Sequence, residues 1–258
     1  MLKTMTIIHA LIFGLVEGIT EFLPISSTAH LILTANLLTI PQTDYIKSFE
    51  IIIQLGAILA VVVLYFKRFF EIEVLKRLIV AFIPTGILGL TLYKMIKSYL
   101  LGNTTIILTA MALGGLILIL LERFVFKTAS TDAPDITTIS YKHCLALGLF
   151  QSIAMIPGVS RSGATIAGGM IIGIPRKTIV EFSFLLAAPT MAAATLLDLL
   201  KSAGSWSSDQ TTSLAIGFIA AFVTAIFAIK WLLKFISGHT FVPFGIYRIA
   251  VSLLFFLR

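Results

Sequence analysis

Two short stretches of this 258-residue chain combine ionisable and hydroxyl side chains. In the first, Glu17, Glu21, Ser27 and His30 lie within a segment of fourteen residues, 17–30. Glu17 and Glu21 are four residues apart, and Ser27 and His30 are three apart, so each pair shares one face of a helix. Nucleophilic and acid–base catalysis use these groups: a hydroxyl, an imidazole and carboxylates. The alternative is that the glutamates and the histidine only hold the segment together by hydrogen bonds.

The second stretch, 157–165, places an arginine among hydroxyl groups, in the order Ser160, Arg161, Ser162 and Thr165. Arg161 keeps its charge in a protein and therefore needs an anion. A glutamate from the first stretch would satisfy it, but its planar fork also matches phosphate oxygens. A helix that begins here adds free backbone N–H groups that favour an anion. The residues that we expect to bind phosphate are Ser26, Ser160, Arg161, Ser162 and Thr165.

The composition indicates where this chemistry takes place. Hydrophobic residues make up 58% of the chain and charged residues 12%, against about 25% charged in ordinary soluble domains. So few charges cannot cover a soluble surface, so we predict a polytopic membrane protein and exclude soluble enzyme classes. Ionisable groups at membrane depth are costly and are therefore candidates for function. The net charge of +7 would suggest nucleic acid in a soluble protein, but here the basic residues are loop signals of topology, and we expect no nucleic-acid partner.

Six segments are long and apolar enough to span a membrane, which takes about 20 residues. They are roughly 46–66, 78–96, 104–121, 179–200, 211–230 and 243–257. Two further apolar stretches, about 4–38 and 143–174, are interrupted in the middle, and each half is too short to span. We predict that both are re-entrant helical hairpins. Glu17 and Glu21 inside the first stretch argue against the alternative, a cleaved secretory signal.

The basic residues predict the orientation. If loop 67–77 is cytoplasmic, alternation places eleven basic residues inside and six outside, with both termini outside. The inside set is Lys67, Arg68, Lys76, Arg77, Arg123, Lys127, Lys142, Arg176, Lys177, Lys230 and Lys234. The outside set is Lys3, Lys47, Lys94, Lys97, Lys201 and Arg258. Arg161 and Arg248 remain at membrane depth.

The two halves of the chain resemble each other. Residues 14–17 match 148–151, residues 24–27 match 157–160 after a one-residue slip, and Glu50 matches Glu181. Each half holds one hairpin and three spans, an odd number, so the second half is inverted relative to the first. We predict one membrane domain, 1–258, with pseudo-repeats 1–126 and 143–258 and a connector at about 127–142. The hairpin turns would then meet near the midplane, where broken helices commonly build sites.

Three charged residues keep open roles. Glu50 and Glu181 either line the cavity or sit at the membrane interface. Arg248 either reaches the site or pairs with a glutamate. The single cysteine, Cys144, excludes an intrachain disulfide, and no cluster of His and Cys suggests a structural metal.

Residues 17–30 (EGITEFLPISSTAH) and 157–165 (PGVSRSGAT) resemble the two signatures of the undecaprenyl-diphosphatase family, also called the bacitracin-resistance family. The resemblance covers essentially the whole chain and implies an all-α membrane hydrolase. Such an enzyme removes the terminal phosphate of undecaprenyl diphosphate and so recycles the lipid carrier for cell-wall synthesis. It implies a multi-pass protein of the bacterial inner membrane with a site open to the outer face. It also implies a divalent cation, Mg or Ca, and no organic cofactor.

Within this chemistry Ser27 is the candidate nucleophile, with His30 as its base or as the acid for the leaving group. Glu21 either orients His30 or holds a cation, and Glu17 could do the same. A water activated by His30 or Glu21 is the alternative nucleophile. The rival function is a lipid-carrier transporter, or flippase, since inverted repeats with broken helices are typical of transporters. The oligomeric state stays open, with a homodimer as one alternative.

Overall fold

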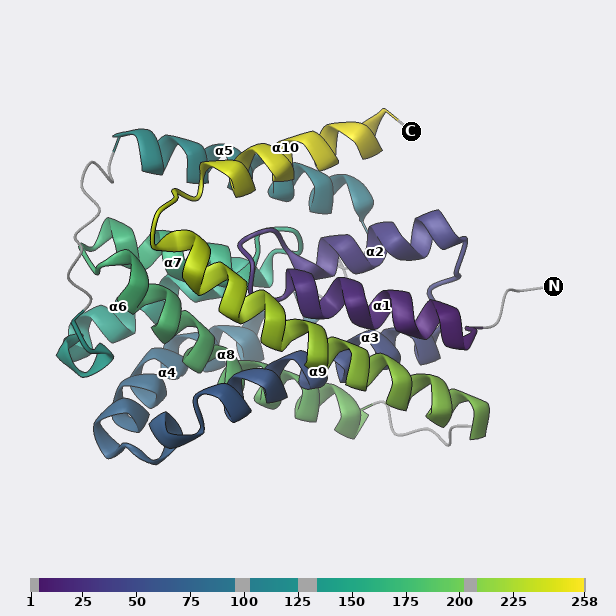
Figure 1. Cartoon of the computed structure of the whole chain (residues 1–258), viewed down its shortest axis with the longest axis horizontal. Helices are drawn as coiled ribbons and strands as arrows, with labels where there is room; N and C mark the ends of the chain where they lie inside the picture. The colour runs from purple at the N-terminus through teal and green to yellow at the C-terminus, as the bar shows by residue number, and fades with distance from the viewer. Residues whose placement is uncertain (1–4, 96–102, 125–133, 202–207, 258) are drawn as a thin grey trace.

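The computed structural model describes residues 5–95, 103–124, 134–201 and 208–257, and these are all-helical, without a strand in the described part (Figure 1). The α-helices are α1 Ile7–Thr20, α2 Ser27–Leu38, α3 Asp44–Leu64, α4 Ile72–Met95, α5 Thr104–Phe124, α6 Tyr141–Ser152, α7 Arg161–Ile171, α8 Arg176–Lys201, α9 Ser208–Ile236 and α10 Val242–Phe256. Short 3₁₀ turns are η1 Phe66–Phe70, η3 Ile136–Thr138 and η4 Ile153–Met155.

Five of these helices, α3, α4, α5, α8 and α9, are long and apolar enough to cross a membrane. Their outer faces carry bare apolar side chains at helical spacing, for example Ile219, Val223 and Phe227 on α9, which are 59%, 42% and 68% exposed. Such faces fit a lipid surrounding, and the prediction of a multi-pass all-α membrane protein is confirmed. The sixth predicted span, 243–257, corresponds to α10, whose 15 residues reach about 22 Å.

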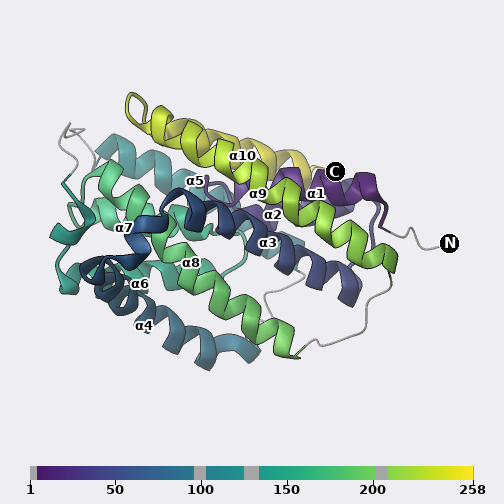
Figure 2. The ribbon, with the colours of Figure 1, turned by 60° about the horizontal axis from the view of Figure 1, so that its bottom comes forward.

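Both interrupted stretches form pairs of short helices. In the first hairpin, α1 and α2 are joined by a turn at 21–26, and in the second, α6 and α7 are joined by η4 and a turn at 156–160. The two turns lie close together in the middle of the molecule, while the hairpins extend toward its opposite ends (Figures 1 and 2). Four helix N- or C-termini therefore meet at the centre.

The long helices pack around these hairpins in matching pairs. α1 packs on α9 as α6 packs on α4, and α5 packs on α10. Glycines permit the close approach: a Cβ at Gly18 would lie 1.9 Å from the hydroxyl of Thr224, and one at Gly148 would lie 2.1 Å from the carbonyl of Ala81. Gly115 permits close packing of α5 and α10 in the same way, since a Cβ there would lie 2.6 Å from the carbonyl oxygen of Gly245.

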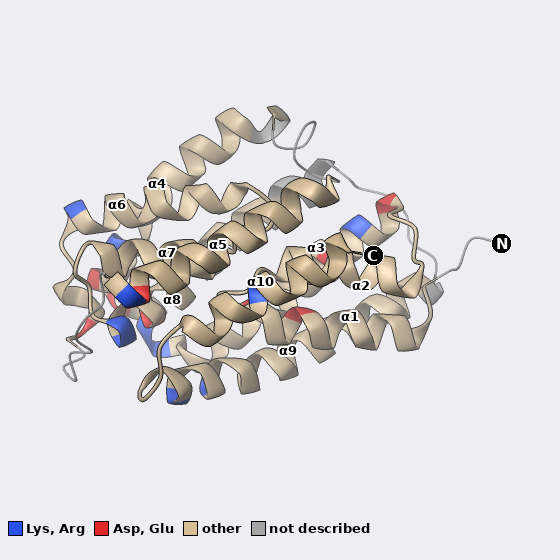
Figure 3. Cartoon of the chain, turned by 90° about the horizontal axis from the view of Figure 1, so that it is seen from above, with Lys and Arg blue, Asp and Glu red and all other residues tan. Residues whose placement is uncertain are grey.

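Most of the charged residues of the described chain lie at one end of the molecule (Figure 3). This end holds the segments 65–77, 134–142, 172–177 and 236–242, which contain most of the basic residues predicted to be cytoplasmic. Lys3, Lys97, Lys127 and Arg258 lie outside the described residues. The starts of α1, α3 and α9 lie at the opposite end (Figure 1).

Candidate functional site

Ser26 and Ser160 begin the two helices that start at the centre. Ser26 is the N-cap of α2 and its hydroxyl accepts from the N–H of Ala29, while Ser160 caps α7 and accepts from the N–H of Gly163. Serine is a preferred N-cap because its oxygen satisfies a free helix N–H. Both serines hold a left-handed backbone, with φ of 72° and 76°. Such strain in a residue other than glycine is typical of functional sites.

These caps correct the register of the internal repeat. Ser26 and Ser160 are 134 positions apart, and so are Glu17 and Gln151. The one-residue slip predicted from the proline positions is therefore wrong. Pro24 corresponds to Gly158 rather than to Pro157, and Arg161 occupies the place of Ser27. Aligning the two halves by their prolines gave the wrong register, because glycine and proline both suit a tight turn and can replace each other there.

The turns are joined by one carboxylate. Glu21 accepts from the guanidinium of Arg161, Oε1 to Nη2 at 2.8 Å, and from the hydroxyl of Ser27, Oε2 to Oγ at 2.5 Å. A glutamate of the first stretch is thus the partner of Arg161 in this structure, which was one of the two alternatives. All three side chains are largely buried. Buried charge-assisted hydrogen bonds of this kind are strong and fix geometry.

His30 has different partners from Ser27. Its Nδ1 lies 2.7 Å from the carbonyl oxygen of Ser26, and its Nε2 lies 2.9 Å from the hydroxyl of Tyr247 on α10. The helical spacing does put Ser27 and His30 in the same turn, but the hydroxyl of Ser27 is bonded to Glu21. Tyr247 was missed by sequence reasoning. A signal existed, since Tyr247 directly precedes Arg248 within an apolar segment.

Glu17 is completely buried, and neither carboxylate oxygen has a hydrogen-bond partner among the described residues. Glu21, one helical turn further on, is a neighbouring charge. A carboxylate buried in this way needs a proton or a cation. The described residues hold no group of three or more His, Cys, Asp or Glu that could bind a metal by themselves, so Glu17 would need oxygen ligands from elsewhere.

The remaining predicted phosphate ligands lie around the start of α7. The hydroxyls of Ser160 and Ser162 are 3.1 Å apart, and Ser162 donates to the carbonyl of Leu23 in the first hairpin at 2.8 Å. Thr165 is fully buried and donates back to the carbonyl of Arg161 at 2.9 Å, so its proton is used within α7. Ser183 on α8 is an additional neighbour, because its carbonyl accepts from Arg161 at 2.9 Å.

Arg248 reaches the centre and pairs with carbonyls. Its guanidinium donates to the carbonyl oxygens of Pro24 at 3.1 Å and Gly158 at 3.0 Å, the two equivalent turn positions. It also donates to Met111 on α5 at 2.9 Å. This arginine is 1% exposed, so one buried cation holds both turns and contributes positive charge to the site.

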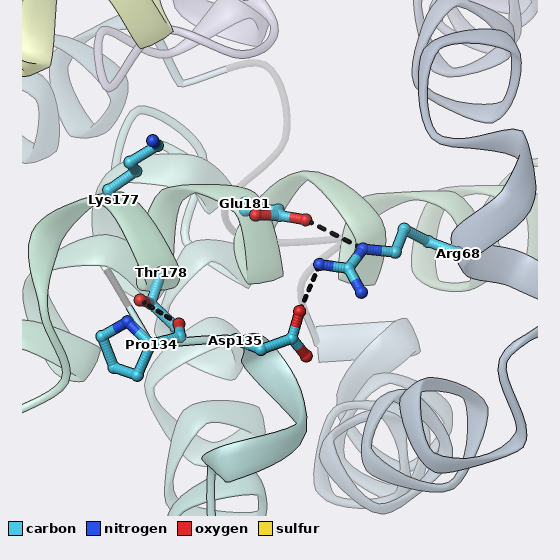
Figure 4. A pocket seen from close by; sticks show the side chains of 6 residues that line it. All are labelled: Arg68, Pro134, Asp135, Lys177, Thr178 and Glu181. Atoms are coloured by element: carbon cyan, nitrogen blue, oxygen red, sulfur yellow. Dashed lines mark hydrogen bonds and ion pairs between the residues drawn. The ribbon is translucent and has the colours of Figure 1, made fainter. Parts of the chain in front are cut away.

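Glu50 and Glu181, whose roles the sequence left open, have different hydrogen-bond partners. Glu50 accepts from Gln42 at 3.1 Å. Glu181 instead accepts from Arg68 at 3.2 Å, and Arg68 also pairs with Asp135 (Figure 4). These residues line a separate cavity of about 170 Å³ at the charged end of the molecule, together with Pro134, Lys177 and Thr178. Glu181 therefore belongs to this ion-pair cluster rather than to the central site.

Asp135 lies outside the membrane-spanning helices, at the start of η3. The backbone N–H of Thr137 and the guanidinium of Arg68 stabilise its charged form and lower the pKa of its carboxyl. Asp135 is thus charged at neutral pH, and the cluster ties η1, η3 and α8 together.

Comparison with known proteins places the whole chain in one family. The family described as bacitracin resistance protein BacA matches residues 10–254. The chain is 54% identical over 253 residues to a protein named undecaprenyl-diphosphatase from Sulfurihydrogenibium sp. (strain YO3AOP1), which covers 98% of this chain and 99% of that protein. Proteins of the same name from Aquifex aeolicus and Methanococcus aeolicus are 53% and 44% identical, covering 97% and 98% of this chain and 98% and 100% of theirs.

Proposed function

The chain belongs to the bacitracin resistance protein BacA family, and we propose that its reaction takes place where the two hairpin turns meet. As a member of this family, the protein is a membrane hydrolase that removes the terminal phosphate of undecaprenyl diphosphate. The product is the monophosphate lipid carrier, which returns to cell-wall synthesis, and the activity confers bacitracin resistance.

The observation that carries this placement is the set of contacts made by Glu21. One carboxylate connects Ser27, a hydroxyl at the start of α2, with Arg161, a cation at the start of α7. A terminal phosphate held by Arg161 and by the N–H groups at the two helix starts would lie beside the hydroxyl of Ser27. Phosphoryl transfer requires mainly this combination of placement and charge neutralisation.

In the proposed first step, the Ser27 oxygen attacks the terminal phosphorus and its proton passes to Glu21. The bond between phosphorus and the bridging oxygen breaks, and the lipid monophosphate leaves with the electron pair. In the second step, water attacks the phosphoserine, and the bond between phosphorus and the Ser27 oxygen breaks. Glu21 returns its proton to that oxygen and takes the proton of the attacking water, which it then releases to solvent. The contact at 2.5 Å between Ser27 and Glu21 supports this assignment of the base over His30. An alternative is a water activated directly by Glu21.

A divalent cation, Mg or Ca, fits the unpartnered oxygens of Glu17. Both ions prefer oxygen ligands, and Mg usually takes one or two carboxylates with substrate phosphates. Glu17, with Glu21 beside it, would hold the cation, and the diphosphate would complete its ligands. When bound, such an ion neutralises charge that develops on the phosphate oxygens.

For the membrane arrangement we propose six spans and two re-entrant hairpins in an inverted repeat. The 134-residue spacing that Glu17 and Gln151 share with Ser26 and Ser160 supports the repeat, as does the paired packing of α1 on α9 and α6 on α4. The charged end fits the cytoplasmic side by the positive-inside rule. The first hairpin then enters from the outer side of the bacterial inner membrane, and the site opens toward that side.

Phosphate release from undecaprenyl diphosphate by the purified protein in detergent tests the proposal. Release that Glu21→Gln abolishes in a well-folded protein supports the central site. Full release by that variant would place the reaction elsewhere. Movement of the intact diphosphate between leaflets of a vesicle, without release of phosphate, would favour the flippase.

A further inference from the structure

His30 is held at three points. Its Nδ1 lies 2.7 Å from the carbonyl oxygen of Ser26, its Nε2 lies 2.9 Å from the hydroxyl of Tyr247, and the two rings stack with centroids 5.5 Å apart and planes within 5°. A side chain fixed in this way has one orientation. The contact joins α2 of the first half with α10 at the end of the second half.

The hydrogen positions follow from the partners. A carbonyl oxygen only accepts, so Nδ1 must carry the hydrogen that faces Ser26. In the neutral imidazole Nε2 then holds the lone pair, and the hydroxyl of Tyr247 donates to it. When His30 takes up a second proton, that proton sits on Nε2 and donates to Tyr247, and the phenol hydrogen is free to point elsewhere.

The two side chains also differ in accessibility. His30 is 9% exposed, whereas Tyr247 is 43% exposed. Both nitrogens of the imidazole are occupied, Nδ1 by the carbonyl oxygen of Ser26 and Nε2 by the phenol oxygen of Tyr247. A proton on Nε2 therefore leaves the ring by way of the phenol oxygen.

We propose that Tyr247 is a further catalytic residue, which passes a proton between His30 and the lipid phosphate that leaves. As the bond between the terminal phosphorus and the bridging oxygen breaks, that oxygen takes the phenol hydrogen of Tyr247. The phenol oxygen takes the Nε2 proton of His30, and His30 becomes neutral. Solvent returns the proton before the next turnover. This relay rests on the proposed function, and it leaves Glu21 as the base for Ser27.

Tyr247→Phe tests the relay, because phenylalanine keeps the stacked ring and removes only the hydroxyl. General acid catalysis typically contributes 10²–10⁴-fold, so we expect kcat to fall by about 10²-fold with little change in KM. Tyr45→Phe is the matched control. The hydroxyl of Tyr45 donates to the carbonyl oxygen of Gln210 at 2.9 Å, and these residues lie on α3 and α9, outside both hairpins. This control should keep wild-type turnover. Tyr247→Phe with wild-type kcat would overturn the proposal.

A double variant shows whether Tyr247 acts through His30. If it does, Tyr247→Phe combined with His30→Gln should be no slower than His30→Gln alone, since both remove the same proton path. A double variant whose loss of kcat equals the product of the two single losses would overturn the relay. Should His30→Gln turn over too slowly to measure, ¹⁵N NMR of histidine-labelled protein decides: the Nε2 signal of His30 must move in Tyr247→Phe, and an unmoved signal would overturn it. Release of phosphate by the wild-type protein separates failure of the relay from failure of the proposed function.

Discussion

Ser26 and Ser160 hold the same left-handed backbone conformation 134 residues apart, and each caps a helix that begins at the centre of the molecule. The carbonyls two residues before them, on Pro24 and Gly158, are both bound by the guanidinium of Arg248. One side chain thus fixes the positions of two helix starts relative to each other. The anion site that we propose depends on this alignment, because the N–H groups of both helices must face the same phosphate.

Arg248→Met should destabilise the protein and reduce turnover. Methionine keeps much of the volume but leaves the carbonyls of Pro24 and Gly158 without their donor, at about 1–3 kcal/mol for each buried group. The unfolding midpoint in detergent measures the effect. Arg123→Met, an exposed change at the end of α5, is the control. An unchanged midpoint in Arg248→Met would mean that the turns do not need this arginine.

Gly114→Ala should displace the guanidinium of the same arginine, although Arg248 itself is unchanged. A Cβ at this position would lie 2.1 Å from Nη2 of Arg248, so the guanidinium must move away from the turns. We expect a lower unfolding midpoint and weaker phosphate release. Gly238→Ala is the matched control, because a Cβ there has no atom within 4 Å. Equal behaviour of the two alanine variants would contradict the packing argument.

Arg161→Lys should lose much of the activity although it keeps the charge. Arg161 donates to Glu21 and to the carbonyl of Ser183 from two nitrogens, and a lysine offers only a point charge. The loss of one strong transition-state contact costs roughly 10²–10³-fold in kcat. Arg123→Lys should be neutral. Wild-type turnover by a folded Arg161→Lys protein would show that Arg161 is only a structural partner of Glu21.

Composition and hydropathy predicted the membrane class, and the interrupted stretches predicted both short helix pairs. The two motifs also supplied the residues that meet at the centre, since Glu21, Ser27 and Arg161 lie in contact. Sequence could not pair them individually: the helical spacing favoured His30 as the partner of Ser27, but tertiary packing brings Tyr247 to that histidine. The contacts of Arg248 and Glu181 likewise depend on helices that are distant in the chain.

The membrane topology can be tested by labelling with an impermeant thiol reagent. Cys144 is fully buried, and Cys144→Ala gives a background without thiols. In intact cells, Asn103→Cys should be labelled from outside, whereas Ile72→Cys should be labelled only after the membrane is opened. Ile72 is 67% exposed, so access does not limit its reaction. Labelling of residue 72 in intact cells would reverse the orientation and would place the charged end outside.

The ion-pair cluster at the charged end should make the stability of the protein depend on pH in the acidic range. Asp135 has a folded pKa below the ordinary value of about 3.9, because Thr137 and Arg68 favour its charged form. The unfolded chain therefore takes up this proton first, so the stabilisation is complete above about pH 4 and is lost as the pH falls through the folded pKa. Asp135→Asn should lower the unfolding midpoint modestly at pH 7 and hardly at all near the folded pKa.

Asp44→Asn is the matched control for this experiment, because Asp44 forms an exposed pair with Lys47 at 3.5 Å. Exposed pairs of this kind contribute little. A difference between wild type and Asp135→Asn that stays the same at all pH values would contradict the assigned direction of the pKa shift.

Ser27→Ala should abolish phosphate release while substrate binding survives. If Ser27 is the nucleophile, its removal leaves no group for the first step, whereas the loss of one hydrogen-bond donor would leave a measurable rate. Glu21→Gln should also stop turnover, because an amide cannot take the serine proton that the 2.5 Å contact delivers. Ser237→Ala, which removes an exposed hydroxyl bonded to Leu233, should change neither binding nor rate.

Acid-quenched reactions separate the two routes to phosphate. With a label on the terminal phosphate, attack by Ser27 should leave labelled phosphoserine in the wild-type protein and none in Ser27→Ala. The label should map to the peptide that contains Ser26 and Ser27, and persistence of the label in Ser26→Ala would assign it to Ser27. Substantial turnover by a well-folded Ser27→Ala protein would exclude the covalent route. The nucleophile would then be water, with Glu21 as its base, since the carboxylate of Glu21 already contacts Ser27 at the start of α2.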